Sequence, residues 1–299
     1  MRILVTGSSG LLGHKLVGLL EHKGFDIIAL YRSKPPATCS ECIKLQLDLT
    51  EPERLVDVVQ EHKPDVVFHL AAFTNVDACE KEREMAWRVN TLSTIALVRA
   101  SVRVGARIVY ISTDYVFDGR RGQYREDDAP SPINYYGLTK LAGETPVLAA
   151  NGVVVRTSGI YGSGPGKKTF PIVVIEKLGR GEEIHAAIDQ WYSPTLNTLL
   201  ARALLTLLEK LDEAVEHGVL HIAGSRVSRY EFALMIAEKF GLPKDLVKPV
   251  KLEELQFIAP RPRDSSLDVT LARQLVGSVP FWDHEAALEE LRRELRQTG

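Results

Sequence analysis

The 299-residue sequence predicts an α/β fold with a doubly wound parallel sheet and a smaller C-terminal α/β lobe. Short apolar runs rich in β-branched residues alternate with longer segments of helical periodicity through the first half of the chain. A glycine-rich turn follows the first of these runs. After about residue 157 the alternation becomes irregular, which indicates that a second structural unit begins there.

Six apolar runs are the expected strands of the first half. Most of them are apolar throughout, as strands covered by helices on both faces should be. Leucines and valines at helical spacing, over residues 11–20 and 55–59, indicate helices between the strands. The six runs are Arg2 to Thr6, Asp26 to Tyr31, Ile43 to Gln46, Val66 to Ala71, Arg107 to Ser112 and Gly152 to Thr157.

The second half contains four helical patterns and one further strand. The helix expected over residues 196–211 and the strand expected over 219–222 return to the sheet, whereas the other helices build the smaller lobe. Those helices are expected over residues 170–178, 230–240 and 285–295. The expected division is a first domain over residues 1–157, rejoined by 190–223, and a second lobe from 158–189 and 224–299.

The composition is that of a globular enzyme, with 45% hydrophobic and 25% charged residues. A net charge of -2 gives no electrostatic reason to bind nucleic acid or an anionic membrane. No apolar run approaches the roughly 20 residues that span a bilayer, and we expect a cytoplasmic protein. Cys39 and Cys42 form a CxxC without a second pair that would complete a zinc site, so we expect two free loop thiols and no metal.

A glycine turn at the first strand-to-helix junction carries the first functional signal. Glycines there permit a tight turn, let backbone N–H groups approach a pyrophosphate at the positive helix end, and let the helix pack close to the strand. The spacing is GxxGxxG, and its position predicts a Rossmann-type dinucleotide-binding domain. The expected cofactor contacts of this turn are Gly7, Ser9, Gly10, Leu11, Leu12 and Gly13.

Three later strand ends add candidate cofactor contacts. Arg32 stands where NAD-specific proteins place an acidic residue, so a 2′-phosphate and NADPH are favoured, with NADH and a merely solvated arginine left open. Asp48, beside Leu49, offers a carboxylate to the adenine amino group. Ala71 and Ala72 are small enough to leave room for the cofactor.

A tyrosine and a lysine four residues apart indicate reductase chemistry. Tyr136 and Lys140 share one face of a helix, where the ammonium can lower the pKa of the phenol and hold the nicotinamide ribose. The phenol can then exchange a proton as hydride moves. Thr113, just past an expected strand, can donate a hydrogen bond to the reacting oxygen.

Longer motifs run through the chain. They are Thr6 to Gly13, Val76 to Glu80, Ser112 to Gly119 (STDYVFDG), Tyr136 to Glu144, Arg156 to Ser158, Asp189 and Gln190 with Ser193 to Thr195, and Arg261 and Pro262 with Ser265 and Leu267. With these motifs the chain resembles the extended short-chain dehydrogenase/reductase superfamily and, within it, the dTDP-4-dehydrorhamnose reductase family. The STDYVFDG block is much more specific than the glycine and tyrosine motifs.

The resemblance implies an NADPH-dependent reductase that acts on the C4 ketone of a deoxy-sugar nucleotide in dTDP-rhamnose biosynthesis. It also implies that Thr74 and Asn90 lie near the nicotinamide, and that the C-terminal lobe holds the nucleotide-sugar diphosphate. Thr113, Tyr136 and Lys140 are the implied catalytic set, and Thr74 counts among the expected cofactor contacts. The expected substrate contacts are Thr74, Thr113, Tyr115, Tyr136 and Arg261.

The chain departs from the family pattern around the sugar. An aromatic residue usually follows the Arg-Thr-Ser motif and helps to position the sugar, but this position holds Gly159. Trp191 and Tyr192 stand where a smaller pair is usual. We therefore expect a wider sugar pocket with weaker discrimination between keto sugars.

Two other functions stay open. One is a nucleotide-sugar epimerase or dehydratase; such enzymes usually keep a tightly held NAD, so Arg32 argues mildly against them. The other is a non-catalytic NADP-binding regulatory subunit like the methionine adenosyltransferase β subunit, which resembles the same reductases. A homodimer also stays open, although the leucine stripe of residues 285–295 is more often intramolecular core.

Overall fold

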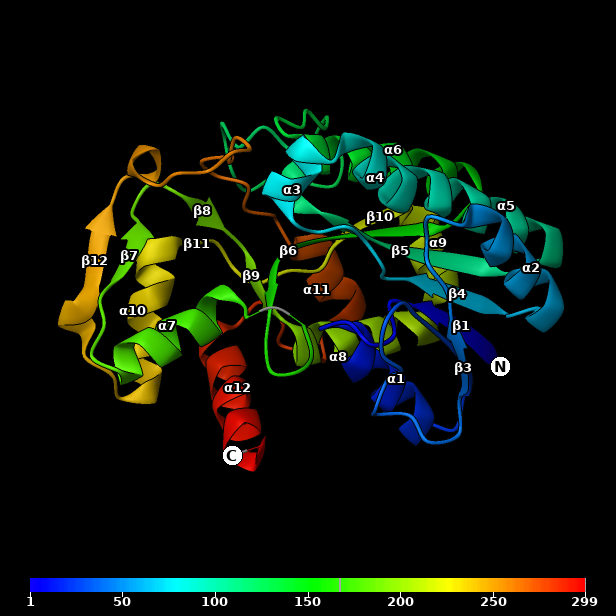
Figure 1. The fold of residues 1–299 in the computed structure, drawn as a ribbon, viewed down its shortest axis with the longest axis horizontal. Coiled ribbons are helices and arrows are strands. Elements are labelled where there is room, and N and C mark those ends of the chain that lie inside the picture. The colour runs from blue at the N-terminus through cyan, green and yellow to red at the C-terminus, as the bar shows by residue number, and fades with distance from the viewer. Residues whose placement is uncertain (167, 299) are drawn as a thin grey trace.

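A parallel sheet forms the centre of the computed structural model, which describes residues 1–166 and 168–298. Its strand order is β10-β6-β5-β4-β1-β2-β3, and β9 pairs with β6 (Figure 1). The order reverses between β1 and β4, where open α/β sheets bind ligands at the carboxyl ends of their strands. The strands are β1 (Arg2–Thr6), β2 (Asp26–Tyr31), β3 (Ile43–Gln46), β4 (Val66–His69), β5 (Arg107–Thr113), β6 (Val153–Tyr161), β9 (Pro194–Leu196) and β10 (Val219–His221).

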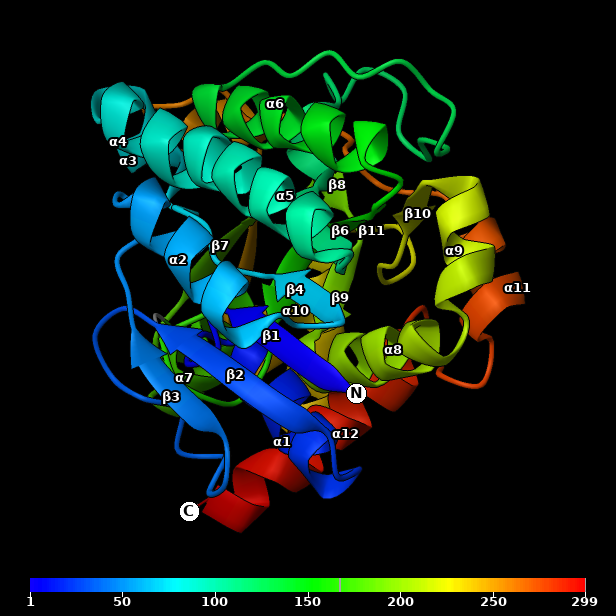
Figure 2. The ribbon, with the colours of Figure 1, turned by 90° about the vertical axis from the view of Figure 1, so that its right-hand side faces the viewer.

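Helices cover both faces of this sheet, which confirms the predicted doubly wound architecture. One layer contains α2 (Pro52–His62), α5 (Ser93–Val104) and α6 (Tyr135–Ala149), and the opposite layer contains α1 (Gly13–His22) and α8 (Asn197–Glu209) (Figures 1 and 2). All four residues of β4 are buried, as a strand between two helical layers requires. Within the described ranges, no helix combines the length and apolar character needed to cross a bilayer.

The smaller lobe lies beyond β6, on the left in Figure 1. Two short sheets build it, one from the parallel pair β7 and β12 and one from the antiparallel pair β8 and β11. Its elements are α7 (Phe170–Gly179), β7 (Ile184–Ala187), β8 (Trp191–Tyr192), β11 (Val227–Ser228), α10 (Arg229–Phe240) and β12 (Val247–Val250). The remaining helices are α3 (Val76–Lys81), α4 (Arg83–Trp87), α9 (Leu211–His217), α11 (Thr270–Val276) and α12 (His284–Thr298).

Two strand ends differ from the sequence prediction. Strand β4 ends at His69, two residues early, because the Thr6 hydroxyl accepts the backbone N–H groups of Leu70 and Ala71 at 3.1 and 3.2 Å. Strand β6 continues to Tyr161, since β9 pairs with it at its far end. It therefore crosses the boundary expected at residue 157, and the domain division stays a prediction.

The two cysteines of the CxxC are joined as a disulfide, so the expectation of two free thiols is wrong. The spacing brings the Cα atoms of Cys39 and Cys42 to 5.8 Å, within the usual range for a disulfide. The loop is held on α1, where the Glu21 carboxylate accepts the N–H groups of Ser40 and Glu41 at 2.6 and 2.9 Å. Local loop geometry, which spacing alone does not specify, decides the pairing.

A buried histidine beneath the sheet edge should make stability depend on pH. His69 contacts the hydroxyls of Thr6 and Thr94 at 2.7 and 3.0 Å, and burial lowers its pKa to about 3. Because the unfolded chain binds a proton near pH 6.5, the folded state loses about 1.4 kcal/mol per pH unit as the pH falls from 6.5 toward 3. Urea unfolding of His69→Asn between pH 6 and 4.5 should give a free energy of unfolding that falls less steeply with decreasing pH, by about that amount per pH unit. Replacing exposed His185 should leave the slope unchanged.

Candidate active site

The glycine turn after β1 is closed as the spacing predicts. Gly7 has φ +67°, and a Cβ there would lie 2.9 Å from the Cα of Ala71. A Cβ on Gly13 would lie 2.1 Å from the Gly7 carbonyl oxygen, so the first turn of α1 can pack on the loop only with glycine here. The Gly10 N–H donates to the same carbonyl at 2.9 Å.

The other predicted residues of this turn differ in exposure. Gly10 is exposed, Ser9 and Leu11 are half-buried, and the Leu12 side chain belongs to the core. Only the backbone of Leu12 can therefore face a cofactor. The Leu11 carbonyl accepts a hydrogen bond of 2.8 Å from Asn197 at the start of α8, which fixes the loop from behind.

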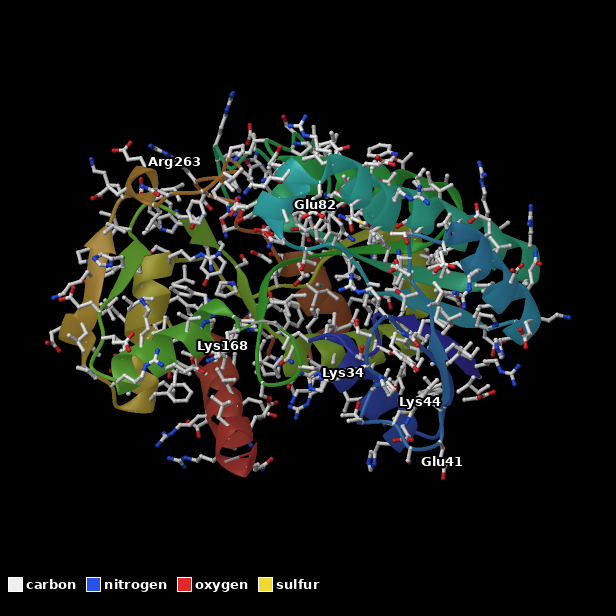
Figure 3. The ribbon with its side chains drawn as sticks, in the orientation of Figure 1. Lys34, Glu41, Lys44, Glu82, Lys168 and Arg263 are labelled. Carbon is white, nitrogen blue, oxygen red and sulfur yellow. A yellow bond between two sulfur atoms is a disulfide. The ribbon has the colours of Figure 1, made fainter. Side chains whose placement is uncertain are left out.

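Arg32 lies directly after β2 and is exposed, at the position that its sequence predicts for a 2′-phosphate contact. Its carbonyl accepts from the Gln46 side chain at 2.9 Å, which anchors the strand end to β3. Figure 3 labels Lys34 and Glu41 on the loop that follows β2, and Lys44 on β3. Lys34 is a second cation that sequence reasoning missed.

The adenine and nicotinamide sides of the expected cofactor site are built differently. Asp48 Oδ1 accepts the backbone N–H of Thr50 at 2.9 Å, which holds the carboxylate near the end of β3, and Leu49 is buried beside it. Ala71 lies against Gly7, and Ala72 is half-buried next to it. Small side chains thus line the segment that follows β4.

Thr74 and Asn90 differ in exposure and in their hydrogen bonds. Thr74 is exposed, whereas Asn90 is buried. The Asn90 side chain accepts the N–H of Phe73 at 2.7 Å and donates to the Thr139 hydroxyl at 3.0 Å. Asn90 therefore ties the segment before Thr74 to the helix that carries Tyr136.

The structure brings Thr113 and Tyr136 together at the carboxyl edge of the sheet. Thr113 ends β5, and Tyr136 lies in the first turn of α6, which Asn134 caps by accepting the Gly137 N–H at 2.8 Å. Desolvation raises the pKa of Tyr136 well above its usual value, and the adjacent Thr113 hydroxyl partly opposes this shift. The Tyr115 ring packs edge-on at a centroid distance of 6.2 Å from that of Tyr136.

Lys140 lies one turn further along α6, buried beneath this pair. Its Nζ is 3.9 Å from the centre of the Tyr110 ring, and burial lowers its pKa to about 7 although Glu144 raises it. The expectation that Lys140 lowers the pKa of Tyr136 stays a prediction. Desolvation is the largest influence on the pKa of the Tyr136 phenol.

A buried carboxylate that sequence reasoning did not assign lies beside Thr113. Asp114 accepts hydrogen bonds from the hydroxyls of Thr113 at 3.1 Å, Ser158 at 2.8 Å and Ser265 at 2.5 Å. Burial raises the pKa of Asp114, and the three hydroxyls oppose this. Three motifs far apart in the chain converge on this one carboxylate. The presence of these three motifs was the only feature of the sequence that could have pointed to this carboxylate.

The space beside Gly159 is filled by another residue, while the expected width of the sugar pocket stays a prediction. Gly159 has φ +49°, and a Cβ there would lie 2.7 Å from Cε2 of Tyr192. The Tyr192 ring on β8 therefore occupies the place that a side chain at residue 159 would need. An aromatic surface is still present at this position, although it comes from a different strand.

Arg261 is already paired in this structure. Its Nη2 donates to Asp77 at 3.0 Å, and its Nη1 donates to the Ala259 carbonyl at 3.0 Å. Asp77 also accepts the Ala259 N–H at 2.9 Å, so the pair fastens the segment around Arg261 to α3. Its role as a substrate contact stays a prediction.

Comparisons with known proteins agree with this geometry. A family model described as RmlD substrate binding domain matches residues 1–296. The dTDP-4-dehydrorhamnose reductase of Mycobacterium tuberculosis is 37% identical over 96% of this chain and 91% of its own length. The reductase of Bacillus anthracis, solved in complex with NADP, is 34% identical with a TM-score of 0.83, covering 98% of this chain and 99% of that one.

A relative with a different name is also similar. Methionine adenosyltransferase 2 subunit beta of Xenopus laevis is 31% identical over 94% of this chain and 84% of its own length. The reductases nevertheless agree with the family model and with the motifs described above. The chain therefore belongs to the dTDP-4-dehydrorhamnose reductase family of NAD(P)-dependent oxidoreductases.

Proposed function

We propose that the protein reduces the C4 ketone of a deoxy-sugar nucleotide with NADPH, as a dTDP-4-dehydrorhamnose reductase. The observation that carries this proposal is the meeting of Thr113 and Tyr136 at the carboxyl edge of β5. The glycine turn lies at the same edge of the sheet, after β1. The NADP bound to the Bacillus anthracis relative supports the choice of cofactor.

The roles follow from the chemistry of each side chain. The nicotinamide cofactor, when bound, supplies the hydride. With substrate bound, the Thr113 hydroxyl turns its single proton from Asp114 to the ketone oxygen, and Tyr136 gives that oxygen a proton as negative charge builds on it. The raised pKa of Tyr136 keeps the phenol protonated at neutral pH, as a proton donor requires. Lys140, one turn further along α6, holds the nicotinamide ribose.

The cofactor contacts are the backbone of the glycine turn, Asp48, Ala71 and Ala72, with Arg32 and Lys34 at the 2′-phosphate. A charge-assisted hydrogen bond to phosphate is worth about 1.5–3 kcal/mol. Arg32→Ala should therefore weaken NADPH binding by about 10-fold or more and leave NADH binding unchanged, as measured by fluorescence titration. Lys44→Ala, which removes a cation on β3, is the control and should leave both affinities unchanged. Equal wild-type affinities for NADPH and NADH would refute the role of Arg32.

The direct test is an assay with dTDP-4-dehydro-6-deoxy-L-mannose and a panel of other 4-keto sugar nucleotides. We expect NADPH to be consumed in proportion to the sugar reduced. An epimerase or dehydratase would interconvert sugars without net consumption of NADPH. A regulatory subunit would consume none with any sugar, and would instead bind a methionine adenosyltransferase and change its activity.

Three further expectations belong to this proposal. The division into residues 1–157 with 190–223, and 158–189 with 224–299, assigns the cofactor to the first unit and the sugar nucleotide to the second. A homodimer and a cytoplasmic location are also expected, and each is tested by a separate measurement. Size-exclusion chromatography with light scattering decides the oligomeric state.

A further inference from the structure

Arg229, the first residue of α10, lies flat against an aromatic ring in the smaller lobe. Its guanidinium carbon is 3.6 Å from the centre of the Tyr192 ring and 5.3 Å from that of Phe170. The Tyr192 ring is itself fixed, because Gly159 packs against one edge and Phe232 lies edge-on at a centroid distance of 6.2 Å. The orientation of the Arg229 guanidinium is therefore set by packing.

Neighbouring arginines have carboxylate partners that Arg229 lacks. Arg226 stacks on Trp191 in the same way, but its Nε donates to Asp264 at 2.8 Å. Arg261 is paired with Asp77. In the described part of the chain, no carboxylate lies within 4.0 Å of the Arg229 guanidinium, although the residue is only half exposed. A partly desolvated cation of this kind favours an anionic ligand.

The charge of Arg229 acts on the active site. Burial raises the pKa of Asp114, Tyr115 and Tyr192, and the positive charge of Arg229 opposes that rise at all three groups. The Tyr192 hydroxyl is buried, and the Arg229 side chain interacts with it. Asp114 already accepts three hydroxyl hydrogen bonds, so it does not need Arg229 as a donor. The Arg229 cation therefore has no carboxylate partner and is available to a ligand.

We propose that Arg229 binds the diphosphate of the sugar nucleotide and that Tyr192 is the positioning residue that holds its guanidinium flat. The inference rests on the proposed function, because it assigns one part of that substrate. The diphosphate is the charged part of such a substrate, whereas the deoxy-keto sugar is neutral. A planar guanidinium matches two phosphate oxygens at once, and its flat orientation costs little conformational entropy on binding.

The test measures binding without turnover. Calorimetric titrations of the NADPH-loaded protein compare dTDP and UDP with thymidine and uridine, which lack phosphates. Arg229→Gln should weaken binding of the nucleoside diphosphates by about 10- to 100-fold and leave the nucleosides unaffected. Arg226→Gln is the matched control, since it removes the same charge three residues earlier from an arginine that already has a partner. It should change the affinities by less than about threefold.

Tyr192 is tested by two variants. Tyr192→Phe keeps the ring and should retain the affinity for nucleoside diphosphates. Tyr192→Leu removes the ring that orients Arg229 and should lower that affinity several-fold. Unchanged NADPH affinity reports that each variant is folded. If dTDP or UDP binds the wild type and Arg229→Gln equally, the inference is wrong and the proposed function stands. If the wild type binds neither nucleoside diphosphate, both are wrong.

Discussion

Replacing Tyr136 with phenylalanine is expected to slow sugar reduction by about 10²–10⁴-fold, the usual contribution of a positioned proton donor. The ring packing against Tyr115 would stay, so the affinity for NADPH should change by less than about threefold. Stopped-flow measurement of NADPH oxidation in a single turnover gives the chemical step. Fluorescence titration gives the cofactor affinity separately.

The neighbouring tyrosine provides a matched control. Tyr135 stacks with Arg83 at 5.0 Å, and only its backbone N–H contacts Glu80. Tyr135→Phe removes the same hydroxyl one residue away and should retain wild-type turnover. If Tyr136→Phe keeps near-normal turnover, the proton comes from another group or from water, and the assigned role is wrong.

Replacing Glu144 with glutamine is expected to destabilise the fold by about 3–5 kcal/mol. Glu144 is 2% exposed and accepts two hydrogen bonds from Arg156, at 3.0 and 2.7 Å, and one from Ser112 at 2.5 Å. The substitution leaves the buried Arg156 guanidinium without a counter-ion. These contacts join α6 to β5 and β6, so the elements that carry Tyr136 and Thr113 would loosen as well.

Urea unfolding measures this loss as a change in the free energy of unfolding. The control is Asp212→Asn, which breaks the exposed pair with Arg107 at 2.7 Å and should cost less than about 1 kcal/mol. If the two substitutions lower the free energy of unfolding equally, burial does not increase the contribution of the Glu144–Arg156 ion pair to stability. A fall in the cooperativity of unfolding would instead point to partial loosening around α6.

Features encoded by short sequence patterns were predictable. Apolar runs and helical spacing located seven strands of the central sheet and several helices to within a few residues, because both depend on local periodicity. The short strands of the smaller lobe and helices such as α5 were not predicted. The glycine turn was predictable for the same reason, since Gly7 and Gly13 are required by contacts within a few residues or to the adjacent strand. Arg32 follows β2 directly, so its position also depended only on a correct strand end.

Features built by packing between distant segments were not predictable. Ser158 and Ser265 reach Asp114 from 44 and 151 residues away, and no spacing rule relates these positions. Tyr192 fills the space beside Gly159 from another strand, and no local pattern relates these two positions. The low pKa of Lys140 was not predicted, because it depends on how deeply this part of α6 is buried.

Transfer of deuteride from NADPH labelled with deuterium at both C4 positions of the nicotinamide tests the central claim most directly. The wild-type protein is incubated with the labelled cofactor and dTDP-4-dehydro-6-deoxy-L-mannose, and the sugar product is examined by mass spectrometry and NMR. The account predicts one deuterium per sugar, bound to C4 in a single configuration, and the same label at a greatly reduced rate with Tyr136→Phe. A product without deuterium, or with deuterium at another carbon, would contradict hydride delivery to the C4 ketone.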